Sequence, residues 1–335
     1  MSESQRIMGR HIPEDEAVSE VIGVVLMLSI VISIMVGVFT VLSPYLDDIN
    51  SARGWSALTT NADQIQERIS TAADSSENSI FHVGLNLDEI RMNPLIGMER
   101  WTVSGDLFGN DRIVSMITGT SLSIQSLNGT MVRVEIITEK NITIHDIVDV
   151  QDVIEILIDS RLPNLVIAQV YDQQNQIIHR LASIRLSGLQ LTSTIAGQIY
   201  SIEMMNGALV EYLPGEVPSV SKQPRLDCVQ LENGSYRASM ALLNLEIEMF
   251  AINSQSTTLK LVSGGNLAIF NDDTRNILIS AQTTERSLST TAYLDDLADQ
   301  YALYRSLGIS QNYVGFGPLA GSVTTSGLTV YPLDE

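Results

Sequence analysis

The residue types that most often catalyse reactions or bind metals are few and scattered in this chain of 335 residues. The four histidines are His11, His82, His145 and His179, and none has a second histidine or a cysteine at the spacing of a zinc site. We expect His179, next to Arg180 in a strand-like run, to be solvated or hydrogen-bonded within the fold. Phosphate loops, dinucleotide fingerprints and nucleophile elbows are also missing from the sequence. The sequence therefore predicts a protein that is not an enzyme and uses no metal or cofactor.

Two acidic groups carry the oxygen ligands that Ca²⁺ prefers. Asp146, Asp149 and Asp152 are spaced three apart, and Asn271–Asp273 follows a strand-like run. Neither group matches the glycine-punctuated loop of an EF-hand, so we interpret both as solvated acidic turns. The one cysteine, Cys228, excludes an intramolecular disulfide, and its strand-like surroundings predict a small buried apolar side chain.

Three Asn-x-Ser/Thr sequons could accept glycans on an exported protein, and they begin at Asn128, Asn141 and Asn233. Asn128 and Asn233 also precede glycine, and Asn-Gly is a common turn sequence. Both interpretations, glycosylation and turn formation, remain open for these two residues.

The charge balance excludes one large class of partners. The chain has 39 acidic and 19 basic residues, for a formal net charge of −20, and its lysines and arginines do not cluster. Binding to nucleic acid needs clustered positive charge, so nucleic acid is not an expected partner. Hydrophobic residues make up 44% of the chain, which is enough for a large packed core.

The strongest signal is an uncharged apolar run of 22 residues from Val21 to Leu42. As a helix, this run would span roughly 30 Å, the thickness of the hydrocarbon layer of a bilayer. Ser43-Pro44 follows it and should end or kink the helix. The alternative is a helix buried in a globular core, but such helices usually interrupt their apolar surface with polar residues. We therefore expect a single membrane-spanning helix.

The residues that flank this run give a weak prediction of orientation. Arg6 and Arg10 precede the run, but so do the acidic residues 14–16, and Asp47 and Asp48 follow it. Positive charge favours the cytoplasmic side, so the C-terminal part should lie outside the cell.

The segment Glu16–Leu26, with the sequence EAVSEVIGVVL, resembles the N-terminus of archaeal type IV pilins. In that family a short polar leader ends in a charged residue and a small one, and a prepilin peptidase cuts before the hydrophobic helix. The resemblance implies cleavage between Ala17 and Val18 and a mature helix that packs against other pilin subunits. It also implies an archaeal surface protein held in the membrane by one helix.

The helical pattern continues beyond the apolar run to about Ser70, and residues 71–79 are typical of a loop. We expect a leader at 1–17, a membrane helix at 18–43, a stalk helix and loop at 44–76, and a β-rich extracellular domain at 77–335.

Beyond Ile80 the apolar pattern changes to the alternation typical of strands. Asn-Gly and Gly-Gly pairs at residues 128, 206, 233 and 264 separate the runs, and Asn206-Gly207 predicts the clearest hairpin. A late helix is expected at Thr291–Ser306, between strand-like runs. The predicted fold is an N-terminal helix followed by a mainly antiparallel, sandwich-like β domain. The strand-like runs lie at residues 112–117, 121–125, 131–138, 154–158, 165–170, 177–186, 199–204, 208–213, 236–250, 258–262, 313–316 and 328–332.

These features lead to two functional hypotheses. The first is a pilin-like subunit of a surface filament, of a minor or adhesin type because its β domain is large. The second is a membrane-anchored envelope or receptor protein that never polymerises. An anchored hydrolase is a weaker third alternative, since no catalytic motif is present.

Overall fold

The computed structural model describes residues 14–107, 112–147, 153–230, 232, 236–247, 256–283, 304–308, 311–315 and 319–333. The chain divides into two compact units, Met1–Arg53 and Gly54–Glu335. We refer to the second unit as the head domain.

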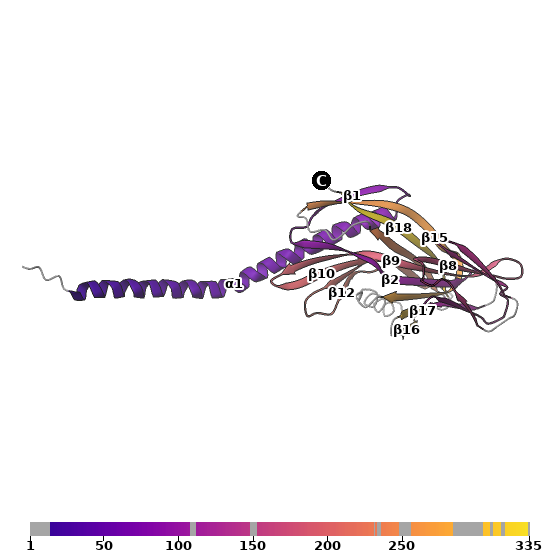
Figure 1. The fold of residues 1–335 in the computed structure, drawn as a ribbon, viewed down its shortest axis with the longest axis horizontal. Helices are drawn as coiled ribbons and strands as arrows, with labels where there is room; N and C mark the ends of the chain where they lie inside the picture. Colours follow the sequence, from indigo (N-terminus) through magenta and orange to yellow (C-terminus); the bar gives the residue numbers. More distant parts are fainter. Residues whose placement is uncertain are drawn as a thin grey trace, which may run out of the picture. The chain divides into compact units, whose positions relative to one another are not determined.

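A single helix, α1, runs from Glu14 to Ala73, and its first part belongs to the first unit (Figure 1). The helix does not end at Ser43-Pro44, because Pro44 lies inside it. Proline removes one backbone hydrogen bond, and the surrounding residues favour helix strongly enough for the chain to continue through it. The predicted long N-terminal helix is confirmed. The predicted loop at 71–79 begins three residues later than expected, after Ala73.

The rest of the described chain is almost entirely β-structure, which confirms the predicted fold class. The strands are β1 (Ile80–Asn86), β2 (Ile90–Asp106), β3 (Ile113–Thr118), β4 (Ser121–Ser126), β5 (Arg133–Thr138), β6 (Ile142–Asp146), β7 (Ile154–Leu157), β8 (Leu165–Tyr171), β9 (Ile177–Ile195), β10 (Gln198–Met205), β11 (Ala208–Tyr212), β12 (Ser219–Lys222), β13 (Leu226–Gln230), β14 (Tyr236–Ile247), β15 (Ser256–Thr283), β16 (Tyr304–Gly308), β17 (Gln311–Gly315) and β18 (Leu319–Leu333).

Fifteen of the strands that the structure describes form one large sheet, whose central order is β12-β11-β10-β9-β2-β15-β18-β14-β13. The pairs are antiparallel except for β14 with β18, among the strands that the structure describes. The long strand β2 pairs with β9 on one side and with β15 on the other. The register of β2 and β9 places Asp106 opposite His179. The Asn206-Gly207 hairpin is confirmed, with both residues at positive φ between β10 and β11.

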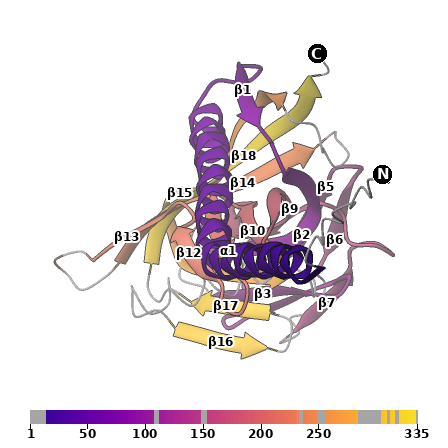
Figure 2. The same ribbon diagram turned by 90° about the vertical axis from the view of Figure 1, so that its left-hand side faces the viewer.

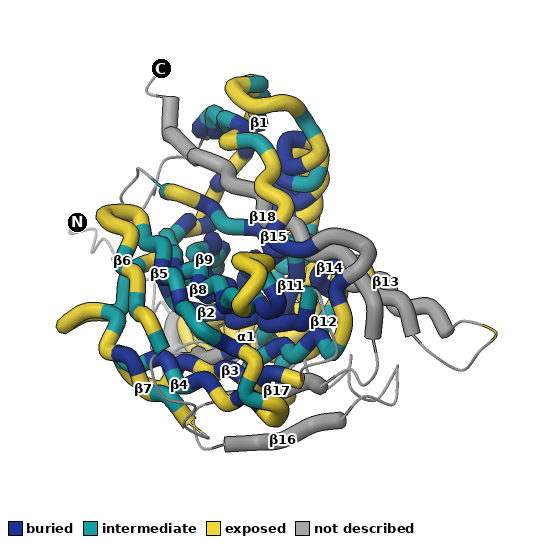
Figure 3. Tube along the Cα trace, turned by 90° about the vertical axis from the view of Figure 1, so that its right-hand side faces the viewer, coloured by how far each residue is buried: buried dark blue, intermediate teal, exposed yellow. Residues whose placement is uncertain are grey.

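Different parts of the large sheet face one another across the main core. Trp101 and Val103 of β2 pack in one cluster with Leu242 of β14 and Phe270 of β15. The buried residues therefore lie on the inner side of long strands, and the exposed ones gather on loops and outer surfaces (Figure 3). This arrangement is sandwich-like, as predicted, although its strands belong to one continuous sheet.

The last turns of α1 are part of the head domain and lie against the sheet (Figure 2). Leu58, Ile65 and Ile69 are fully buried in a second cluster, together with apolar side chains of β1, β2, β9, β10, β14 and β15. Gly54 permits a close approach at the start of this segment, because a Cβ there would lie 2.8 Å from the side chain of Ile195. Burial of this helical face stabilises the head domain.

A third cluster lies between the small sheet β3-β4-β7 and strands β5, β8 and β9. Its members include Leu122 and Ile124 of β4 and Val134 of β5, all fully buried. The small sheet is therefore held to the large one by apolar packing.

Two local predictions were wrong or fall outside the described part. Gly264-Gly265 does not reverse the chain, because β15 continues through it with a shift of register against β18. The helix predicted at Thr291–Ser306 is not shown. Residues 291–303 lie outside the described residues, and Tyr304–Ser306 belong to β16, which pairs with β17.

Candidate functional site

The first candidate site is the apolar surface of α1 between Val21 and Leu42. Every side chain in this segment is exposed, including Val24 at 67% and Phe39 at 71%. Burying such a surface away from water is strongly favourable, whether against lipid or against other helices.

The few polar side chains of this segment are satisfied within the helix. The hydroxyls of Ser29, Ser33 and Thr40 each donate to the backbone carbonyl four residues earlier, over 2.7 to 2.8 Å. A hydroxyl group that donates within its own helix can enter the hydrocarbon layer without leaving its donor unsatisfied. The segment is therefore chemically compatible with a membrane along its whole length.

Among the described residues, α1 is the one helix long and apolar enough to cross a membrane, with a mean hydropathy of 2.9 in its most apolar window. Residues 16–53 match the family model described as the N-terminal segment of archaeal type IV pilins. In this N-terminal segment the chain is archaeal type IV pilin-like. No curated protein and no solved structure matches it.

The match confirms the resemblance predicted from Glu16–Leu26. Ala17 and Val18, the predicted cleavage pair, lie inside both the matched segment and α1. Their side chains are not among those described, and cleavage between them stays a prediction.

The sequons of this pilin-like chain occupy different places. Asn128 and Asn141 are exposed, in the β4–β5 and β5–β6 connections, so both are accessible to a glycosylating enzyme. Thr138 donates to the side-chain oxygen of Asn141 over 2.7 Å and orders that turn. Asn233 lies outside the described residues.

The acidic groups considered for Ca²⁺ do not gather into a described site. Asp146 is exposed at the end of β6, Asp149 and Asp152 lie outside the described residues, and the side chains of Asn271–Asp273 in β15 are not described. Within the described residues, no group of three or more His, Cys, Asp or Glu side chains could hold a metal ion. Cys228 lies in β13, as its strand-like pattern predicts, and its side chain is not described.

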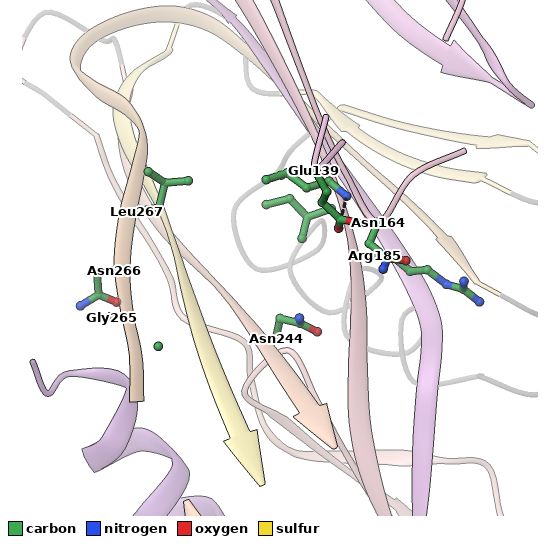
Figure 4. Close-up of a pocket in the computed structure, with 10 residues that line it drawn as sticks. Glu139, Asn164, Arg185, Asn244, Gly265, Asn266 and Leu267 are labelled. Carbon is green, nitrogen blue, oxygen red and sulfur yellow. Dashed lines mark hydrogen bonds between the residues drawn. The ribbon is translucent and has the colours of Figure 1, made fainter. Parts of the chain in front are cut away.

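The second candidate site is a cleft of about 310 Å³ in the head domain (Figure 4). On one side lie Glu139 of the β5–β6 turn and Arg185 of β9, and on the other lies the bend of β15 at residues 264–267. Asn244 of β14 lies between them. The cleft is lined by Glu139, Asn164, Leu165, Ile184, Arg185, Asn244, Gly264, Gly265, Asn266 and Leu267.

Arg185 adds positive charge to this otherwise acidic protein. Burial lowers the pKa of the neighbouring Arg100 to about 10, with a further contribution from the charge of Arg185, while Glu139 acts in the opposite direction. In Figure 4 the side chain of Arg185 points away from Asn244 and Leu267, so its guanidinium group does not enter the cleft.

A third group of polar residues has the connectivity of a nucleophile, a base and an orienting acid. Ser115 Oγ lies 2.7 Å from His179 Nε2, and His179 Nδ1 lies 2.7 Å from a carboxylate oxygen of Asp106. The other oxygen of Asp106 accepts a hydrogen bond from the side-chain amide of Asn276, also over 2.7 Å. A carboxylate accepts hydrogen bonds, so Nδ1 of His179 donates to Asp106, and the hydrogen bond between Nε2 and the Ser115 hydroxyl completes the group.

This Ser115–His179–Asp106 group is sealed inside the head domain. Ser115 is 3% exposed, His179 1% and Asp106 5%, and none of them lines the described cleft. A nucleophile must reach its substrate, so the burial favours a structural role. The group links β3 of the small sheet to β2, β9 and β15 of the large one. The expectation that His179 is hydrogen-bonded within the fold agrees with this arrangement.

Two further carboxylates, Glu99 and Glu203, are also buried, at 1% and 4% exposure. Glu99 accepts from the indole of Trp101, and Glu203 accepts from Gln190 and from the hydroxyl of Tyr212. Burial raises the pKa of Tyr212, and the nearby carboxylates raise it further. Tyr212 therefore stays neutral well above pH 10 in the folded protein.

The sequence alone does not identify the cleft or the buried group. The residues of the cleft come from segments more than a hundred positions apart, and no spacing in the sequence joins them. The pairing of Asp106 with His179 depends on the register of β2 and β9, which a β-bulge at Leu95–Glu99 shifts. Only the N-terminal site has a contiguous sequence signal.

Proposed function

We propose that this chain is a membrane-anchored, extracytoplasmic subunit of a type IV pilin-like system, of a minor or adhesin type. The observation that supports it most is the coincidence of the pilin match at residues 16–53 with a helix whose apolar surface is exposed from Val21 to Leu42. A prepilin peptidase removes the leader 1–17 by cutting between Ala17 and Val18. The membrane helix at 18–43 then holds the chain, and residues 44–76 connect it to the β-rich domain at 77–335.

Assembly would use the same helix. Ser29, Ser33 and Gly37 follow one another at intervals of four, so they lie along one side of α1. Small residues at this spacing let two helix backbones approach closely in an apolar environment. Once the leader is removed, this side packs against the helices of neighbouring subunits, and the β-rich domain remains outside the membrane.

The adhesin-type assignment rests on the head domain. The head domain has three apolar clusters, so it is a large folded domain in addition to the helix that packs in a filament. Polar residues line its cleft. Such a domain is suited to display on a filament at low copy number, where it binds without forming the bulk of the filament.

Quantitative mass spectrometry of sheared surface filaments and of the remaining membranes tests the proposal. We expect the chain in the filament fraction at a low ratio to the most abundant pilin. A chain found only in membranes, while other pilins appear in the filaments, would contradict the filament role and indicate an anchored envelope protein. Deletion of the prepilin peptidase is the control: it should remove the chain from the filament fraction and leave the unprocessed chain in the membranes.

A further inference from the structure

We propose that the head domain pairs with the head domain of a second copy of this chain through strand β6 of each. The two strands lie antiparallel about a two-fold axis and join two sheets into one. The free edge of β6, the apolar side chains along it and the charges at its ends support this pairing. The inference goes beyond the proposed function and does not rest on it.

Strand β6 forms an edge of the large sheet. It pairs with β5 on one side, and no strand among those that the structure describes pairs with its other side. β6 lies at the rim of the head domain in two opposite views (Figure 2 and Figure 3). Edge strands of natural proteins are usually protected by proline, lysine or a β-bulge. β6 contains no proline or lysine, and its register with β5 has no shift.

The backbone of β6 directs its groups to the two sides in a defined order. The N–H of Thr138, at the end of β5, donates to the carbonyl of Asn141 over 2.9 Å. Backbone groups point to alternate sides along a strand, so Asn141 and every second residue after it face β5. The N–H and C=O groups of Ile142, Ile144 and Asp146 therefore point to the free side, where a second strand can bind them.

Two isoleucines of β6 are exposed on the same face of the sheet. Ile142 is 60% exposed and Ile144 is 59% exposed. Ile142 lies beside Ile137 of β5, which in turn lies beside Ile167 of β8. Ile167 packs against the main core cluster, so the apolar row continues from the core to the free edge. A strand added to β6 shields both exposed isoleucines from water.

Two other edge strands of the large sheet are less suited to this role. β1 exposes His82, Gly84 and Asn86 in addition to Ile80. β12 ends in the exposed Lys222 and pairs with β11 through a register shift. Both strands therefore offer a partner less apolar surface than β6 does.

The residues of β6 select one symmetric register. With Thr143 opposite Thr143 of the second copy, Ile142 lies opposite Ile144, and their outward backbone groups face each other. Lys140, in the turn before β6, then lies near Asp146 of the second copy, and both residues are exposed. Each isoleucine has an apolar neighbour and each charge an opposite one. A register with Ile144 opposite Ile144 is less favourable, because it sets Ile142 against Asp146.

Disulfide trapping tests this register. One strand pair is smaller than a standard protein interface, so the association is weak in solution and a covalent link is needed to detect it. The full chain is purified in detergent and produced without glycosylation, because a glycan on Asn141 would lie beside the paired strands. Cys228→Ala removes the native cysteine from every variant.

Thr143→Cys should form a disulfide-linked dimer under mild oxidation. The two-fold axis sets its two copies opposite each other in a non-hydrogen-bonded pair, with Cα atoms about 4.5 Å apart. His145→Cys, at the next half-buried position on the same face of β6, is the matched control. Its copies lie about 13 Å apart in this register, and we expect at least fivefold less dimer.

An exchange of charges tests the same register independently. Lys140→Glu brings like charges together across the axis and should reduce the trapped fraction of Thr143→Cys at least fivefold, with an unchanged Tm. Addition of Asp146→Lys should restore trapping, because the charges are then opposite again. Lys222→Glu, the same change at the exposed end of β12, is the control and should leave trapping unchanged.

Two results would overturn the proposal. Association through α1 alone would trap Thr143→Cys and His145→Cys to the same extent. A charge exchange that fails to restore trapping would show that Lys140 and Asp146 do not meet across the axis. Neither result bears on leader processing or on entry into filaments, so the proposed function is tested separately.

Discussion

At the scale of single residues, the head domain buries polar groups at positions where the alternating pattern shows only ordinary strand. Ser115, His179 and Asp106 come from three different strands and meet in a closed hydrogen-bonded group. A buried polar group stabilises a fold only while its partners remain, because an unmatched buried atom carries its full desolvation cost. The hydrogen bonds of this group therefore form only when β3 is packed correctly against the large sheet.

Removing the Ser115 hydroxyl should expose this dependence. Ser115→Ala leaves His179 Nε2 buried without its partner, and we expect the free energy of unfolding to fall by about 1–3 kcal/mol. Urea denaturation followed by tryptophan fluorescence measures the change. Ser123→Ala, in the half-buried middle of β4, should change it by less than about 0.5 kcal/mol.

The same group also allows a test of the structural assignment. A fluorophosphonate probe should not label the folded chain at Ser115, since that side chain is 3% exposed. Stoichiometric labelling of Ser115 that disappears in a His179→Gln variant would contradict a purely structural role.

Tyr212 gives the stability of the head domain an alkaline dependence. Its pKa is raised in the folded state by burial and by the neighbouring carboxylates, so folding favours the neutral phenol. This contribution is complete below the pKa of about 10 of an unfolded tyrosine and is lost as the pH rises above it.

Tyr212→Phe removes the ionisable hydroxyl. We expect it to cost about 1 kcal/mol at pH 7, through the hydrogen bond to Glu203. Between pH 9 and 11 the variant should then lose less stability than the unaltered chain. Urea midpoints at several pH values measure this, and parallel curves for the two chains would show that Tyr212 does not cause the alkaline loss.

At the scale of elements, α1 combines two surfaces with different roles. Its residues 21–42 expose an apolar surface, whereas Leu58, Ile65 and Ile69 bury theirs in the head domain. The spacing of these three residues predicts a helical face, and the uninterrupted apolar run predicts the membrane segment. The sequence-based prediction succeeds here because helix patterns depend on residues close together in the chain.

The strand pattern is less predictable for a physical reason. β2 is not among the predicted strands, because Pro94 and the bulge around Gly97 break its alternation, although both are tolerated next to β9. The predicted strand at 258–262 is the beginning of β15, which reaches Thr283 through its own register shifts. The parallel pairing of β14 with β18 joins distant segments, and no local pattern contains that information.

The buried face of α1 should contribute strongly to the stability of the head domain. Ile65→Ala removes a fully buried side chain, and we expect the free energy of unfolding to fall by about 2–5 kcal/mol. Gln64→Ala, at the adjacent exposed position, should have little effect. Equal losses for the two variants in chemical denaturation would contradict the packing of this face.

The small residues of the membrane segment should affect assembly and not insertion. Gly37→Leu raises the hydrophobicity of α1, so membrane association should persist, but the larger side chain prevents close approach of a neighbouring helix. We expect the filament-bound fraction of the chain to fall at least fivefold in sheared preparations.

The control for Gly37→Leu is Val38→Leu, which also places a leucine in the membrane segment but at the adjacent position, off the side formed by the small residues. It should assemble normally. If Gly37→Leu enters filaments as well as Val38→Leu does, the proposed packing side of the helix is wrong.

At the scale of the whole molecule, the N-terminal segment indicates the class of the protein, whereas the head domain contains the candidate cleft. The match at residues 16–53 supports a pilin-like class, and the acidic composition argues against nucleic acid as a partner. The residues that line the cleft of the head domain converge only through the fold. The class could therefore be predicted from the sequence, whereas the candidate binding site required the structure.

The central claim is that the chain is processed and used as a pilin. Intact mass and N-terminal sequencing of the protein from native membranes, with and without the prepilin peptidase, test it most directly. We predict a mature chain that starts at Val18 and a longer, unprocessed chain when the peptidase is absent. A chain that starts at Met1 or Ser2 in both strains would contradict the account and indicate a membrane-anchored surface protein outside the pilin pathway.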